Sequence, residues 1–263
     1  MEILYGLGFL LLFSVSAIGG MVLRAHLREK HLSSENMAAV QLVAGLLVTF
    51  AAIILSLQLS TARTAFDAAN KDRSLYAAQL ARLDECLKNL GPGMEPARLG
   101  LRRYTAAVIA STWPDEAAPF VDGMPDVTHM AVSGEDATLK VLMNEIGTMV
   151  DAVAPPDAAR ANVAARCRAN YTMVQQSRWA VIEDANGASR SSFSDIVAFW
   201  LALVFLSFGL QVPRRFLGAI VLGIGVVAVA SVMFVIVDLE IPYGGVFGIT
   251  SSAMRDALAD MMR

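Results

Sequence analysis

Four long runs without a charged side chain constrain the fold of this chain more than any other feature of its sequence. The runs cover residues 3–23, 37–59, 196–212 and 216–237. A helix needs roughly 20 mostly apolar residues to cross about 30 Å of hydrocarbon, with about 17 residues as the lower limit. Core helices of a soluble protein rarely repeat this pattern four times. The sequence therefore predicts an all-α membrane protein with four transmembrane helices.

The first run has a second interpretation, a cleaved signal peptide. Such a peptide begins with basic residues and continues with a short apolar region that ends at small residues. Here the first charge is that of Glu2, the apolar run is longer, and the basic residues follow it. We therefore expect this run to remain as a membrane anchor.

The stretch between the second and third runs has the composition of a water-soluble domain. It opens with a seam in which Arg73 alone is charged: Ala62, Phe66, Ala69, Arg73, Tyr76, Leu80, Leu83, Leu87 and Leu90. This spacing is typical of a helix that buries one face. Further helices are expected over residues 95–112, 135–153 and 157–186. Short connections favour antiparallel neighbours, so we predict a four-helix bundle whose seams pair within one chain or between subunits.

The predicted domain boundaries follow from these patterns. Residues 1–59 hold transmembrane helices 1 and 2 with a short basic loop, and residues 60–192 form the extramembrane helical bundle. Residues 193–240 hold transmembrane helices 3 and 4. Residues 241–263 form an interfacial turn and a short amphipathic helix. The outer pair of bundle helices is expected to continue transmembrane helices 2 and 3.

The short loops carry the charges that indicate sidedness. Arg24, Arg28 and Lys30 follow the first run, and Arg214 and Arg215 lie between the last two. Short basic loops stay in the cytoplasm, whereas long translocated domains contribute little to orientation. We therefore expect a multi-pass protein of the inner (plasma) membrane, with the central domain and both termini extracytoplasmic. Three basic residues on the opposite side weaken this signal: Arg63, Lys71 and Arg73.

The two cysteines of the chain, Cys86 and Cys167, both lie in the central domain. Cys86 follows the second run by nearly as many residues as Cys167 precedes the third. If continuous helices leave the membrane side by side, the two sulfurs lie at the same height, which a disulfide requires. An oxidising compartment permits the bond. Two unrelated buried thiols are the alternative.

The segment after the fourth run is the most distinctive in the chain. Two carboxylates stand at the membrane end of a helix, where they are costly unless wetted or paired. A proline, a tyrosine and two glycines then turn the chain. The candidate pore mouth or gate consists of Asp238, Glu240, Pro242, Tyr243, Gly244 and Gly245. The simpler interpretation is an interfacial exit turn, followed by a tail helix that lies on the membrane or docks on the bundle.

Small residues in the fourth run allow close approach of another helix. Gly218, Gly223 and Gly225 therefore form either a helix-packing surface or a line of glycines facing a pore. Packing is the default interpretation, and the pore line is the sharper hypothesis.

Several classes of function are disfavoured. The net charge of −3 and the absence of a basic patch with interleaved aromatic residues argue against nucleic acid as a partner. The His, Cys and acidic residues show no metal-ligand spacing, and the sequence has no nucleophile elbow or phosphate-binding loop. We therefore expect neither enzyme activity nor a cofactor or metal.

Five segments resemble a known family: residues 31–36, 57–67, 101–114, 238–245 and 251–258. Together they are similar to the bacterial bestrophin-like four-helix membrane proteins, a family filed as a domain of unknown function. Glu240 and Ile241 depart from the family pattern, in which Asp and a polar or basic residue are common. The resemblance covers nearly the whole chain and implies an oligomeric channel like the true bestrophins.

The resemblance leaves the conducted ion open. Anion pores are commonly lined by basic rings, and the four runs contain neither Arg nor Lys. True bestrophins also place their large domain in the cytosol, whereas the loop charges here indicate the opposite side.

The leading hypothesis is a homo-oligomeric ion channel or channel-like protein in the lipid bilayer. The alternative is a non-conducting structural or assembly protein. It would bind a membrane or periplasmic protein partner through its extracytoplasmic domain or its transmembrane helices.

Overall fold

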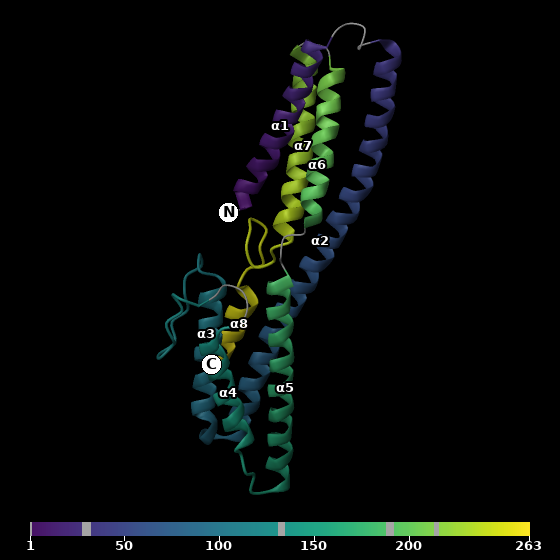
Figure 1. The fold of residues 1–263 in the computed structure, drawn as a ribbon. Helices are drawn as coiled ribbons and strands as arrows, with labels where there is room; N and C mark the ends of the chain where they lie inside the picture. Colours follow the sequence, from purple (N-terminus) through teal and green to yellow (C-terminus); the bar gives the residue numbers. More distant parts are fainter. Residues whose placement is uncertain (1, 28–32, 131–134, 188–191, 213–215) are drawn as a thin grey trace. The chain divides into compact units, whose positions relative to one another are not determined.

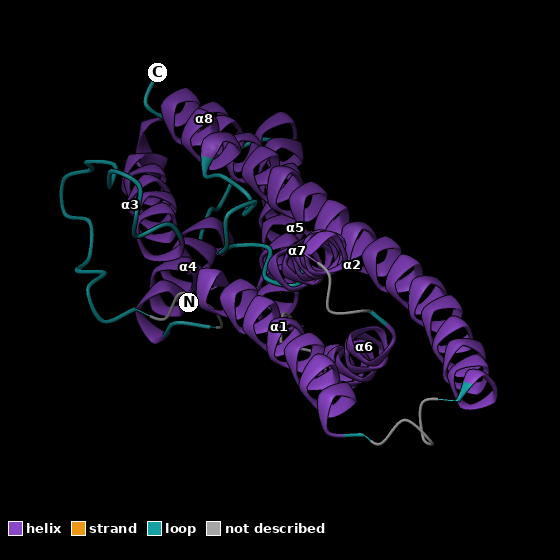
Figure 2. Ribbon diagram, turned by 90° about the horizontal axis from the view of Figure 1, so that it is seen from above, coloured by secondary structure: helices purple, strands orange, loops and turns teal. Residues whose placement is uncertain are grey.

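The computed structural model describes residues 2–27, 33–130, 135–187, 192–212 and 216–263. In these ranges the chain forms helices joined by loops, without strands (Figures 1 and 2). The order is α1 (Glu2–His26), α2 (Ser34–Leu90), the short 3-10 turn η2 (Pro92–Met94), α3 (Glu95–Thr112), α4 (Ala137–Asp151), α5 (Ala158–Gly187), α6 (Ser192–Gln211), α7 (Phe216–Leu239) and α8 (Ser252–Met261).

Four of these helices, α1, α2, α6 and α7, are long and apolar enough to cross a membrane. They contain the four uncharged runs, so the prediction of an all-helical chain with four candidate spans is confirmed. Arg28, Lys30, Arg214 and Arg215, on which the predicted sidedness largely rests, lie outside the described residues.

The chain divides into two compact units. The first unit comprises Met1–Phe66, Ser189–Ile241 and Gly245–Phe247, and the second comprises Asp67–Ala188, Pro242–Gly244 and Gly248–Arg263. Helix α2 contributes residues to both units. At 57 residues without interruption, it is about 85 Å long by the rise of an α-helix.

In the first unit, α1 packs against α6 and α7 (Figure 2). Phe13 is fully buried, and its ring centroid lies 5.2 Å from that of Phe205 on α6. The closest approach of α1 and α6 is at Gly20 and Gly209. A Cβ added at Gly20 would lie 2.1 Å from the Leu206 carbonyl oxygen, and one at Gly209 would lie 2.1 Å from the Ala17 carbonyl oxygen. This crossing therefore depends on the absence of side chains.

Arg24 closes the end of α6 in the same unit. Its Nη1 donates to the carbonyl oxygens of Leu210 at 3.0 Å and Gln211 at 2.7 Å. The last carbonyls of a helix lack intrahelical partners, and a cation there is favoured by the helix dipole. Arg24 therefore has a structural role in addition to any part in orienting the chain.

The predicted seam of α2, which begins in the first unit and continues in the second, is the face that the chain buries. Phe66 and Leu90 are half-buried, and the other seven seam residues are buried. The seam residues from Tyr76 onward pack within the chain, against residues of α3, α4, α5 and α8. For this part of the seam, the structure therefore shows pairing within one chain, which is one of the two predicted alternatives.

A fifth helix joins the expected four in the second unit. Met254, Ala257, Leu258 and Met261 of α8 are buried in the core that the other helices share. Of the two positions left open for the tail helix, the structure has the docked one.

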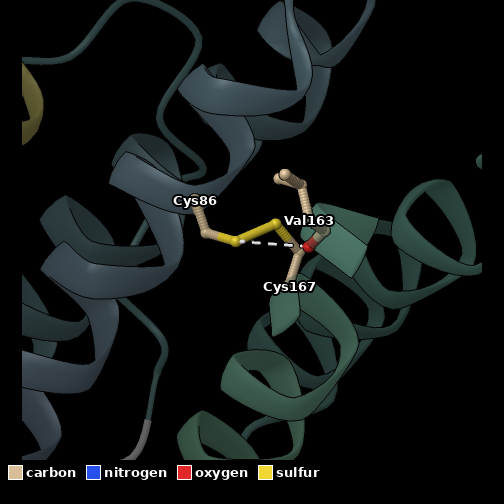
Figure 3. The surroundings of a disulfide bond; sticks show 3 residues. All are labelled: Cys86, Val163 and Cys167. Atoms are coloured by element: carbon tan, nitrogen blue, oxygen red, sulfur yellow. Dashed lines mark hydrogen bonds between the residues drawn. A yellow bond between two sulfur atoms is a disulfide. The ribbon is translucent and has the colours of Figure 1, made fainter. Parts of the chain in front are cut away.

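The disulfide joins α2 and α5 (Figure 3). The sulfurs of Cys86 and Cys167 are 2.01 Å apart, and the Cα atoms are 5.5 Å apart. Cys167 is fully buried, whereas Cys86 is 8% exposed and its Sγ lies 3.8 Å from the carbonyl oxygen of Val163. The pairing expected from the equal spacing of the two cysteines is therefore present.

Candidate functional site

The turn after α7 begins with a buried carboxylate. Asp238 is 1% exposed, in the last turn of the helix. Its Oδ1 accepts a hydrogen bond from Val246 N at 2.8 Å, and its Oδ2 accepts one from Phe247 N at 2.9 Å. Two backbone donors thus replace the water that a carboxylate loses on burial.

Gly245 allows the chain to bend around this carboxylate. Its φ is +82°, and a Cβ there would lie 2.6 Å from Asp238 Oδ1. Both the left-handed backbone and the lack of space require glycine. Asp238 and Gly245, two members of the candidate gate, are therefore brought together, and the contacts of Asp238 are those of a residue that shapes the turn.

Glu240 has different surroundings from Asp238. It is half-buried, and its Oε1 accepts a hydrogen bond from Ser194 Oγ on α6 at 3.4 Å. This bond joins the end of α7 to the beginning of α6. Of the two residues, Glu240 is the more exposed, although its Oε2 is buried.

Pro242, Tyr243 and Gly244 belong to the second unit, where they form a closed turn. Ile249 N donates to the Pro242 carbonyl oxygen at 2.8 Å. Trp113 Nε1, at the end of α3, donates to the Ile249 carbonyl oxygen at 2.6 Å, and the Trp113 ring meets the Tyr243 ring edge-on at 6.0 Å. An indole and a tyrosine therefore fix this part of the turn to the second unit.

The Tyr243 hydroxyl lies among charged groups of the second unit. Burial raises the pKa of Tyr243 well above its usual value, the charge of Asp184 raises it further, and the charge of Arg73 opposes this. Burial, with the charge of Asp72, also raises the pKa of Asp184. Arg73 Nη1 donates to the Thr250 carbonyl oxygen, and its Nη2 donates to Asn70 Oδ1 at 2.9 Å. The one charge in the seam of α2 thus binds the backbone ahead of α8.

Side chains of other elements bind α8 at both ends. Ser251 N donates to Glu116 Oε1 at 3.2 Å, and Arg255 Nε donates to Glu116 Oε2 at 3.1 Å. The hydrogen bond from the Ser251 hydroxyl, followed by those from its backbone and Arg255, lowers the pKa of Glu116. At the other end, Arg102 Nε donates to the Met261 carbonyl oxygen at 2.9 Å. An anion at the N-terminus and a cation at the C-terminus both complement the helix dipole.

The glycines of α7 have more open surroundings than Gly20 and Gly209. A Cβ at Gly223 would meet nothing within 4 Å, and one at Gly225 would lie 3.9 Å from the Phe205 ring. Gly218 is half-buried. Gly223 lines a groove of about 280 Å³ between α1 and α7, with Ala17 and Ala219 among its other residues. These glycines leave surface open to lipid, to a second copy or to a pore.

The family model of the bestrophin-like domain matches residues 11–254. The chain belongs to the bestrophin-like family. The match covers three candidate spans in full, α1 from residue 11 onward, the turn after α7 and the beginning of α8, in agreement with the resemblance seen in the sequence. No curated protein and no solved structure matches the chain.

In the bestrophin-like chain, four residues bind the turn after α7 or the ends of α8 although sequence reasoning did not assign them there. They are Arg73, Arg102, Trp113 and Glu116. Arg73 gave a signal, because it is the one charge in an otherwise apolar seam. Glu116 gave no signal, because it stands among other acidic residues of a loop, yet it binds Ser251 and Arg255. In the part of the bestrophin-like chain that the structure describes, no group of three or more His, Cys, Asp or Glu residues could hold a metal ion.

Proposed function

We propose that this bestrophin-like chain is one subunit of a homo-oligomeric membrane channel. The observation that carries the proposal is the family match over residues 11–254, which includes three of the candidate spans in full and most of the first. A channel needs membrane helices that meet around a path, and a single chain with four such helices supplies one part of that ring.

The surface of the spans supports association with further copies. Within the apolar stretch of each candidate span, the share of residues buried inside the chain ranges from 11% in α2 to 44% in α6. Large side chains along α2 point away from the chain's own packing, among them Leu42, Leu46, Ile53 and Leu57. Gly223 on α7, where an added Cβ would meet nothing within 4 Å, leaves room for the close approach of a helix from another copy. Lipid or other subunits must cover these surfaces.

We further propose that the channel prefers cations. Arg24 is bound to the last carbonyls of α6, and the described interiors of the spans contain neither Arg nor Lys. Anion pores are commonly lined by basic rings. Glu240 is the candidate selectivity residue, because it is more accessible than Asp238, whose oxygens accept backbone hydrogen bonds.

The proposed sidedness places the second unit outside the cytoplasm, with the short loops inside. The disulfide between Cys86 and Cys167 supports this, since disulfides persist in oxidising compartments and are rare in the cytosol. The inner (plasma) membrane is the proposed location.

Ion flux tests the channel. The purified protein is placed in sealed liposomes, and potassium, sodium and chloride gradients are imposed separately. We expect flux with cations favoured over chloride, and a reduced preference in Glu240→Gln. Glu183→Gln is the matched control, because Glu183 is an exposed carboxylate of the second unit. Flux that does not exceed that of empty liposomes, with folded and inserted protein, contradicts the proposal.

A non-conducting assembly protein is the second candidate function, and one residue favours it. Phe120 is 87% exposed in the loop between α3 and α4, where an isolated aromatic side chain suits contact with another protein. The mass of the complex in mild detergent separates the two functions. A multiple of the chain mass favours the channel, and a stoichiometric second protein that is lost in Phe120→Ser favours assembly.

A further inference from the structure

A groove runs along the disulfide in the second unit. Its volume is about 400 Å³, within the range of about 300–1,000 Å³ that is typical of small-molecule sites. One wall is the face of α2 that carries Arg82, Glu85, Cys86 and Asn89, at the spacing of one helix face. The other wall is α5. The disulfide links the two walls, so their separation is fixed.

The charged groups of this groove lack partners among the residues that the structure describes. Arg82 on α2 and Arg166 on α5 both line it, and neither guanidinium makes an ion pair or hydrogen bond with another described residue. This is unlike the other arginines of the second unit discussed above, which bind carboxylates or carbonyls. Asn89 and Asn170 add an amide from each wall. Two guanidiniums and two amides thus face one space.

Guanidinium groups match carboxylates and phosphates in geometry, because their N–H donors form a planar fork. One arginine on each wall suits a solute with an acid group at each end. Glu85 is the one acidic residue of the lining, so Arg82 and Arg166 together leave the groove with a positive charge. Glu85 also supplies an acceptor for a hydroxyl or ammonium group. Val163 and Met173 give the groove an apolar side, which suits a short carbon chain.

We propose that this groove binds a small solute carrying two anionic groups, with Arg82 and Arg166 each contacting one of them. None of the lining residues belongs to the turn after α7, and the proposal does not depend on conduction. Because Cys86 lines the groove and is 8% exposed, whereas Cys167 is fully buried, a bound solute also covers the more accessible cysteine of the disulfide.

The test uses the purified full chain in a neutral detergent, with succinate and inorganic pyrophosphate as separate probes. Sodium chloride of equal ionic strength is the reference. A solute that binds the folded state alone raises the unfolding midpoint as its concentration rises. We expect such a rise with at least one probe, and the stronger probe identifies carboxylate or phosphate as the preferred group.

Variants assign the effect to the groove. The pair Arg82→Gln with Arg166→Gln removes one positive charge from each wall and should abolish the rise. The control pair, Lys88→Gln with Arg160→Gln, removes the same charges from the same helices outside the lining. The pair Arg82→Lys with Arg166→Lys keeps both positive charges but removes the planar set of guanidinium N–H donors. It should therefore give a smaller rise of the unfolding midpoint.

A second readout reports occupancy directly. Reduction of the disulfide by dithiothreitol should slow severalfold in the presence of the effective probe, and this protection should be absent in the Arg82→Gln, Arg166→Gln pair. The proposal is overturned if a probe raises the unfolding midpoint of the Arg82→Gln, Arg166→Gln pair as much as that of the control pair. It is also overturned by a midpoint that neither probe raises above the sodium chloride reference.

Discussion

The guanidinium of Arg98 donates to both carboxylate oxygens of Asp84, with Nε 3.0 Å from Oδ1 and Nη2 3.0 Å from Oδ2. Both side chains are buried between α2 and α3 in the second unit. The hydrogen bond to Asp84 raises the pKa of Arg98. Arg98 also pairs with Glu95 at 2.9 Å. The pair links two adjacent helices in a bidentate geometry, in which two N–H groups of the guanidinium each donate to one carboxylate oxygen.

Loss of one partner from this pair should destabilise the protein strongly. Arg98→Met leaves the carboxylate of Asp84 buried and unpaired, and removal of one partner of such a pair costs about 3–5 kcal/mol. Chemical unfolding of the purified protein measures the change. In contrast, Arg160→Met removes an exposed pair with Asp157 and should change the free energy of unfolding by less than about 0.5 kcal/mol. Equal effects of the two substitutions would contradict the assignment.

A methyl group at the α1–α6 crossing should separate the two helices. The Cβ of Gly20→Ala would overlap the backbone carbonyl of Leu206, and backbone cannot move aside as a flexible side chain can. We expect a loss of roughly 1–3 kcal/mol, as for overpacked cores. Gly8→Ala on the same helix is the control, because a Cβ there meets nothing within 4 Å. This control should be neutral or stabilising, since alanine favours helix.

The docking of α8 should weaken in acid. The pKa of Glu116 is lowered below its usual 4.5, chiefly by the Ser251 hydroxyl. A carboxyl with a lowered folded pKa contributes its stability above the unfolded value, and this contribution is lost as the pH falls through the folded value. The difference in unfolding midpoint between the wild-type protein and Glu116→Gln should therefore be constant near neutral pH and narrow below pH 4.5. Glu145→Gln, an exposed change on α4, should show no such narrowing.

Asp238 and Gly245 should each be intolerant of a small change. Asp238→Asn replaces one carboxylate oxygen by an amide NH2 group, so one of the two backbone N–H groups loses its acceptor. The loss of such a buried acceptor costs roughly 1–3 kcal/mol. Gly245→Ala meets both the positive φ and the carboxylate oxygen. Proteolysis of the segment between α7 and α8 should be faster in both variants than in the wild-type protein. Asp256→Asn, an exposed change on α8, should cleave at the wild-type rate.

Removal of the disulfide should destabilise the second unit without altering the arrangement of its core. The bond closes a loop with a sequence separation of 81 residues, and loss of a native disulfide typically costs about 2–4 kcal/mol. Cys86→Ser and Cys167→Ser should give the same drop in unfolding midpoint. On a non-reducing gel both should migrate as the reduced wild-type protein does. Reactive thiols in the untreated native protein would contradict the bond.

Local patterns in the sequence predicted much of this fold. The seam from Ala62 to Leu90 follows the helical period, so its buried face was visible without a structure. The limits predicted for the next helix, 95–112, are those of α3, because Gly91, Pro92 and Gly93 interrupt the chain before it and Trp113-Pro114 after it. The paired cysteines were visible because each lies at a similar distance along a helix from an apolar run.

Contacts between distant segments were not accessible in this way. Gly20 and Gly209 look like many other glycines in the apolar runs, and their importance arises when two helices cross at that level. The face of α8 was predicted from its period, but its partner was not, since a period identifies a buried face without naming what covers it. Arg24 was interpreted through its charge alone, whereas its contacts are with the last carbonyls of α6.

Helix α8 has a consequence for the order in which this protein matures. Its side chains Met254, Leu258 and Met261 complete the core of the second unit, yet the ribosome makes them after α6 and α7. The core of the nascent second unit therefore keeps an open apolar surface while the last two candidate spans are synthesised and inserted. During this interval the core of the unit is incomplete, and its folding ends when α8 arrives.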